Sequence, residues 1–113
     1  MVDHTDSLQN VIHKWRQKNF PNGNADDQLL GVVEEVGELA HARLKMKQGI
    51  RVNEDLIYKE MDAIGDIVIF LMGYRSYRNI SLFHCIMEAW QEVKERDWVK
   101  NKETGNANNN TGL

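Results

Sequence analysis

The segment MDAIGDIVIFLM, residues 61–72, constrains the fold more than any other part of the chain. Its apolar side chains surround a helix on nearly every side, and a helix that is apolar all round is a buried one. Asp62 and Asp66, at positions i and i+4, nevertheless share one face of it. Carboxylates are rarely buried unless they are paired or bind a metal, because stripping water from an unpaired charge is costly. The segment therefore predicts a buried helix whose charges have a use.

A second acidic strip lies in LLGVVEEVGELA, residues 29–40. Glu34 and Glu38 are about 40° apart on a helix, and Glu35 and Glu38 about 60°. Like charges at this spacing repel each other by about 0.2–0.5 kcal/mol per pair. A hard divalent cation, which takes oxygen ligands and leaves room for substrate phosphates, would offset that repulsion. The alternative is a solvated glutamate face on this helix, with Asp66 paired to an arginine.

Helical periodicity and helix-ending residues predict an all-α fold with four helices, over residues 7–19, 24–47, 53–77 and 81–95. Asn24 and Asn53 are suitable N-caps, and Gly49 is a suitable helix end. No β-hairpin pattern is visible. Because a short connection favours antiparallel neighbours, we expect the second and third helices to bring their acidic strips face to face. Gly37 and Gly65 lie inside these strips, and close backbone approach there would justify the cost of glycine, about 1 kcal/mol each.

Length and composition indicate one domain over residues 1–103 and a disordered, Asn-rich tail over residues 104–113. The formal net charge of −3 argues against a nucleic-acid binder. Cys85, the single cysteine, cannot form an internal disulfide and fits a reducing compartment. The N-terminus is polar, and the apolar run 67–72 is far shorter than the ~20 residues of a membrane span. We therefore expect a soluble, cytoplasmic protein with no membrane partner.

EEVGEL followed by DAIGDIVIFL resembles the MazG-like, all-α nucleotide pyrophosphohydrolases, whose signature is ExxE on one helix and ExxD on the next. The resemblance spans residues 15–98. It implies a four-helix bundle that forms a homodimer or homotetramer. It also implies Mg²⁺-dependent hydrolysis of an NTP or dNTP to the monophosphate and pyrophosphate, with Mn²⁺ able to substitute, in the house-cleaning of nucleotide pools.

The resemblance also implies the metal ligands. Glu35 and Glu38 match the ExxE glutamates, and Asp66 matches the closing aspartate. The chain departs from the signature at Ala63, where the family has its second glutamate. Asp62 is one residue earlier on nearly the same helical face, and we expect it to substitute as the fourth ligand.

Other site residues are less strongly indicated. Glu34, with Glu35 and Glu38, completes the expected catalytic set, either as a partner of the ligands or as a base that positions water. Trp15 could stack on a nucleobase, although a tryptophan at helical spacing is also typical of a core. Lys94 and Arg96 could bind phosphates or could be ordinary surface charges.

Three alternative functions remain open. Glu38 and His41 form the ExxH motif of di-iron bundles, but such bundles need that motif on two helices and the chain has one copy. A phosphoribosyl-ATP pyrophosphohydrolase would use a related fold and related chemistry. A non-catalytic interaction module could present Trp90 and Trp98 to a partner, but it would not explain aspartates on a buried helix.

Overall fold

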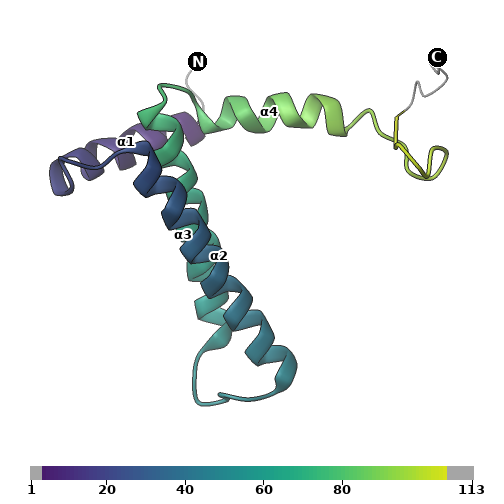
Figure 1. The fold of residues 1–113 in the computed structure, drawn as a ribbon, viewed down its shortest axis with the longest axis horizontal. Coiled ribbons are helices and arrows are strands. Elements are labelled where there is room, and N and C mark those ends of the chain that lie inside the picture. The colour runs from purple at the N-terminus through teal and green to yellow at the C-terminus, as the bar shows by residue number, and fades with distance from the viewer. Residues whose placement is uncertain (1–3, 107–113) are drawn as a thin grey trace. The chain divides into compact units, whose positions relative to one another are not determined.

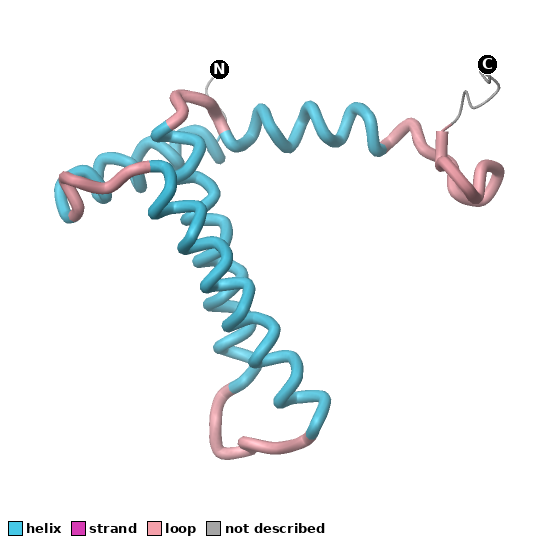
Figure 2. Tube along the Cα trace, viewed as in Figure 1, coloured by secondary structure: helices cyan, strands magenta, loops and turns pink. Residues whose placement is uncertain are grey.

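The computed structural model describes residues 4–106, which form four α-helices and no β-strand (Figure 1). The helices are α1 (His4–Asn19), α2 (Ala25–Gln48), α3 (Leu56–Tyr77) and α4 (Leu82–Val93). The connections between them are short, as Figure 2 shows. The predicted all-α fold is confirmed. Within the described range, no helix has the length and apolar character needed to cross a membrane.

The ends of α2 are those that the sequence predicts. Asn24 accepts a hydrogen bond from the backbone N–H of Asp27 at 2.9 Å, and Gly49 ends the helix in the left-handed region at φ 69°. The predicted start of α3 at Asn53 is wrong. Asp55 is the N-cap, and its Oδ1 accepts a hydrogen bond from the N–H of Tyr58 at 2.9 Å. Asn53 instead lies in the turn before the cap.

The chain divides into two compact units at the bond between Leu82 and Phe83. In the first unit, α2 and α3 form an antiparallel hairpin, and α1 packs against α3 (Figure 1). α4 lies almost entirely in the second unit. The packing within the first unit is therefore that of three helices, and the four-helix bundle stays a prediction.

Gln9 is a buried amide that fastens α1 to the end of α3. Its Nε2 donates hydrogen bonds to Ser76 Oγ and to the carbonyl of Ile80, both at 3.1 Å. Its Oε1 accepts a hydrogen bond from the backbone N–H of Leu82 at 2.8 Å. Because a buried amide without partners is costly, this fully bonded side chain fixes the orientation of α1 on the hairpin.

Side chains pack closely against other glycines than the two predicted. A Cβ atom built on Gly37 or Gly65 would meet nothing within 4 Å, so the expected close approach at these positions is wrong. A Cβ atom at Gly31 would instead collide with the ring of Phe70, and one at Gly73 would collide with the side chain of Arg16. These two glycines leave room for the side chains of Phe70 and Arg16, which line the cavity described below.

Few apolar side chains are buried in this arrangement. The buried ones are Ala42, Leu56, Ala63, Met72 and Leu82. On α3, Ile57 is 66% exposed and Met61 is 65% exposed. The chain by itself therefore leaves part of this helix uncovered, because α2 and α1 cover only part of its circumference.

The second unit continues after α4 in a compact turn. Asp97 Oδ1 accepts hydrogen bonds from the N–H groups of Val99 and Lys100, and the N–H of Asp97 donates to the carbonyl of Gly105 at 2.6 Å. Asn106 pairs with Arg96 in an isolated β-bridge. The first residues of the predicted disordered tail, 104–106, thus make backbone contacts with residues 96–101. The rest of that tail, residues 107–113, lies outside the described residues.

Candidate functional site

The two acidic strips meet in a pocket of about 340 Å³ between α2 and α3. Its lining contains all five carboxylates singled out in the sequence and three further side chains: Glu34, Glu35, Glu38, His41, Lys59, Asp62, Ala63 and Asp66. The antiparallel pairing of α2 and α3 brings the strips together. The pocket therefore concentrates negative charge from two helices in one small volume.

The electrostatics of the pocket show how closely these groups interact. Partial burial raises the pKa of Glu35 from its ordinary value, and the charges of Asp66, Glu34, Glu38 and Asp62 raise it further. Partial burial also raises the pKa of Asp66, which is raised again by the charge of Asp62 and by a hydrogen bond with it. Burial and the neighbouring carboxylates therefore disfavour the ionised forms of Glu35 on α2 and of Asp66 on α3.

The donor set suits a hard divalent cation, because it consists of carboxylate oxygens. Among residues 4–106, however, no three His, Cys, Asp or Glu side chains converge closely enough to hold a metal ion as they stand. The pocket is thus acidic without being a preformed cage. An ion bound there would have to draw the carboxylates inward, which their position on flexible side chains allows.

Ala63 and Asp62 occupy different environments, although they are neighbours on α3. Ala63 is 2% exposed, whereas Asp62 is exposed. Asp62 nevertheless lines the pocket and acts electrostatically on both Glu35 and Asp66. The structure thus brings a carboxylate to the pocket from position 62, in place of one from position 63.

Two residues of the pocket lining, Lys59 and His41, were not among the predicted site residues. His41 is indicated in the sequence only by the ExxH motif that it forms with Glu38. Lys59 lies at the rim, one turn before Asp62 and Ala63, and its Nζ is 3.4 Å from Glu54 Oε2. The i, i+3 spacing from Asp62 is the signal that could have placed it on this face. His41 also lines the pocket, about one turn after Glu38 on α2.

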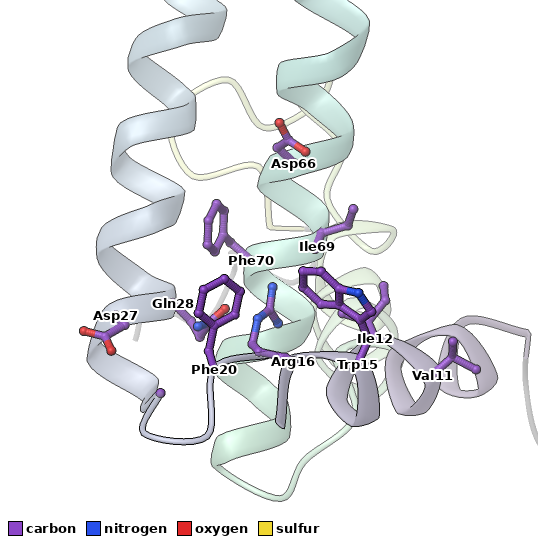
Figure 3. A pocket seen from close by; sticks show the side chains of 11 residues that line it. Val11, Ile12, Trp15, Arg16, Phe20, Asp27, Gln28, Asp66, Ile69 and Phe70 are labelled. Carbon is purple, nitrogen blue, oxygen red and sulfur yellow. The ribbon is translucent and has the colours of Figure 1, made fainter. Parts of the chain in front are cut away.

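A larger cavity of about 670 Å³ lies between α1, α2 and α3 (Figure 3). Its walls are mainly apolar and aromatic, from Val11, Ile12, Trp15, Arg16, Phe20, Gly23, Asp27, Gln28, Asp66, Ile69 and Phe70. The rings of Trp15 and Phe20 meet edge to face, with their centroids 5.9 Å apart. Asp66 lines both this cavity and the acidic pocket, so the two sites adjoin at one carboxylate.

Arg16 and Gln28 are the buried polar side chains of this cavity, exposed to 4% and 6%. The guanidinium of Arg16 lies 5.7 Å from the centre of the Phe70 ring. Arg16 Nη1 and Gln28 Oε1 are enclosed, have no hydrogen-bond partner among the described residues, and both lie against Gly73. Neither burial could be predicted from the sequence, because arginine and glutamine usually occupy exposed helix positions.

The other predicted substrate-binding residues lie in the second unit. Lys94 follows α4 and is exposed, and Arg96 forms an ion pair of 3.5 Å with Glu92. Neither residue belongs to the lining of the acidic pocket or the aromatic cavity. Their predicted contact with phosphates stays a prediction.

Comparison of the chain with protein-family models, curated proteins and solved structures found no match. The resemblance to the MazG-like enzymes therefore depends on the residues of the two acidic strips. The function of the site has to be inferred from those residues and from the cavity beside them.

Proposed function

We propose that this protein is a Mg²⁺-dependent nucleotide pyrophosphohydrolase, which converts an NTP or dNTP to the monophosphate and pyrophosphate. The observation that carries the proposal is the adjacency of the two sites at Asp66. One is a carboxylate pocket suited to a divalent cation, which when bound would attract phosphate oxygens, and the other is an aromatic cavity suited to a base. A nucleotide has these same two parts, joined by a sugar.

Glu35, Glu38, Asp62 and Asp66 are the residues that would hold Mg²⁺ or Mn²⁺. The raised pKa values of Glu35 and Asp66 support this role, because burial and neighbouring carboxylates disfavour their charged forms and a bound cation would relieve both effects. When bound, a divalent ion on carboxylates supplies charge stabilisation to phosphate oxygens and activates water near neutral pH.

The side chains of the chain itself have the remaining roles. Glu34, exposed on the pocket wall, is the candidate base that orients the attacking water. Lys59, the cation in the lining, can exchange its exposed pairing with Glu54 for a phosphate oxygen. Trp15 and Phe20 would hold the base in the adjoining cavity, because aromatic rings stack on any base.

We further propose that the active form is a homodimer or homotetramer. The exposed apolar side chains of the hairpin support it, among them Leu30, Val33, Ile57 and Met61, each at least 65% exposed. Soluble monomers rarely leave contiguous apolar patches of this kind uncovered. A second copy covering the hairpin would complete the core that the chain lacks by itself.

The decisive experiment is a panel of NTPs and dNTPs with Mg²⁺, in which pyrophosphate and orthophosphate are measured separately. Pyrophosphate and the monophosphate are the expected products. Glu38→Gln should abolish turnover, whereas the matched control Glu60→Gln, on α3 but outside the pocket lining, should not. Orthophosphate as the product, or equal activity of the two variants, would refute the proposal.

A further inference from the structure

We propose that Arg16 selects the base of the substrate by donating to a ring carbonyl oxygen, so that guanine and pyrimidine nucleotides are preferred to adenine nucleotides. This inference depends on the proposed function, because it assigns the base-binding half of the same site. Arg16 lines the aromatic cavity together with Trp15 and Phe70 (Figure 3).

The guanidinium of Arg16 lies buried in the wall of the aromatic cavity. It is 4% exposed, and no carboxylate forms an ion pair with it among residues 4–106. Its Nη1 has no acceptor, and burial lowers the pKa of Arg16 below its ordinary range. The Phe70 ring at 5.7 Å offers a cation–π contact worth only about 0.5–2 kcal/mol. A buried cation in this state is best satisfied by a strong acceptor from a ligand.

The aromatic cavity suits a nucleobase better than a phosphate group. The apolar walls would strip water from a phosphate, and the carboxylates of Asp27 and Asp66 in the lining would repel it. A base loses little hydration by comparison and gains about 1–3 kcal/mol by stacking on an aromatic ring such as Trp15. The volume of about 670 Å³ is within the usual range for small-molecule sites, about 300–1,000 Å³.

The bases differ in the hydrogen-bond acceptors that they offer to a guanidinium. Arginine has N–H donors and no acceptor. Guanine offers O6 and N7 to its fork, and the pyrimidines each carry a carbonyl at O2, whereas adenine has no carbonyl and its exocyclic amine is a donor. Gln28 Oε1, beside Arg16 Nη1 over Gly73, can accept an N–H group from the same base. The pair therefore favours bases in which an acceptor and a donor lie close together and the acceptor is a carbonyl oxygen.

The test compares kcat/KM for dGTP, dUTP, dCTP and dATP in the wild-type protein and in Arg16→Met, which keeps length and removes the donors. We expect wild type to prefer the three carbonyl-bearing bases, and the preference to fall about tenfold or more in Arg16→Met, since a good bidentate contact discriminates by about 1–3 kcal/mol. Arg16→Lys, which retains the charge, should keep part of the preference. Arg43→Met, on the exposed surface of α2, is the matched control and should change nothing.

A uniform loss on all four nucleotides, with an unchanged ratio, would assign Arg16 a purely structural role and overturn the inference. If circular dichroism shows that Arg16→Met does not fold, Arg16→Lys replaces it in the test. A reduced preference for the carbonyl-bearing bases in Arg16→Lys would then support the inference, and an unchanged preference would overturn it. A second measurement separates this inference from the proposed function. Quenching of Trp15 fluorescence by dGMP and dAMP is followed with EDTA present, in a Trp90→Phe, Trp98→Phe background.

Stronger quenching by dGMP, lost in Arg16→Met, would support base selection even if no triphosphate is hydrolysed. Equal quenching by the two monophosphates, or none, would refute base selection even if pyrophosphate is released in the activity assay. The two proposals can therefore fail independently.

Discussion

Asp62 and Asp66 lie one turn apart on α3, and both line the acidic pocket. Partial burial raises the pKa of Asp66, and the neighbouring carboxylate of Asp62 raises it further. Glu35, across the pocket on α2, has a pKa raised by burial and by the charges of the same aspartates and of its own helix neighbours. Without a counter-ion, this group of side chains repels itself, and the first two predictions follow from that repulsion.

Mg²⁺ or Mn²⁺ should raise the melting temperature of the protein, because a ligand that binds only the folded state stabilises it by about 2.7 kcal/mol at 100 times its Kd. Asp66→Asn should abolish this response while leaving the helicity unchanged. Thermal denaturation followed by circular dichroism, with EDTA as the reference, measures both. A metal-induced shift that persists in Asp66→Asn would exclude Asp66 as a ligand.

Stability of the metal-free protein should depend on pH through Glu35 and Asp66. Their folded-state pKa values are raised, so their contribution to stability is fully present below the ordinary carboxyl pKa and is lost as pH rises through the raised values. At neutral pH, Asp66→Asn should therefore stabilise the metal-free protein, by about 1–3 °C given ~0.2–0.5 kcal/mol per repelling pair. Urea denaturation at several pH values checks the sign, and a destabilised Asp66→Asn in EDTA would contradict it.

Asp62→Ala should reduce activity on a scale comparable to Glu38→Ala, because we expect Asp62 to replace the carboxylate missing at Ala63. Initial rates of pyrophosphate release under saturating Mg²⁺ provide the comparison. Normal turnover by Asp62→Ala would mean that three carboxylates suffice.

Lys59→Ala should raise KM for the triphosphate more than it lowers kcat, because Lys59 is expected to contact phosphate oxygens at the pocket rim. A charged hydrogen bond can contribute about 1.5–3 kcal/mol, but this side chain is about half exposed, so a rise of a few-fold to about tenfold is expected. Lys47→Ala, in the last turn of α2 and outside the lining, is the control. If both variants give the same KM, Lys59 has no role in substrate binding.

Light scattering at micromolar concentration should give the mass of a dimer or tetramer. The physical reason is the exposed apolar surface of α2 and α3, which includes Leu30 and Ile57. Twofold symmetry is the usual arrangement for such an assembly. An active species with the 13.1 kDa mass of one chain would refute the oligomer and any site shared between copies.

Local signals in the sequence were enough to predict the four helices and the five carboxylates of the acidic pocket. Asn24 and Gly49 delimit α2 because a cap and a left-handed glycine act within a few residues. The cap of α3 was placed two residues too early, since Asn53 and Asp55 are both good caps and only the turn at 52–54 distinguishes them. Helical spacing and the short connection between α2 and α3 were enough to predict that Glu35 and Asp66 lie on facing sides of one pocket.

The aromatic cavity could not be predicted in the same way. Arg16 and Gln28 are buried by the angle at which α1 crosses the hairpin, and that angle depends on long-range contacts such as those of Gln9 with Ser76 and Ile80. Only Trp15 was singled out, through its chemistry and not through its position. Gly37 and Gly65 illustrate the opposite error, because their spacing suggested contacts that the packing does not make.

Gly73 limits the order in which this cavity could change over evolution. The ends of Arg16 and Gln28 both lie against its Cα, so a new side chain at position 73 would displace both. The atoms that would be displaced are the far ends of two long side chains, so a substitution at Gly73 requires both side chains to move or to be shorter. The effect of a change at position 73 on base preference therefore depends on the residues at positions 16 and 28, and the three positions form an epistatic group.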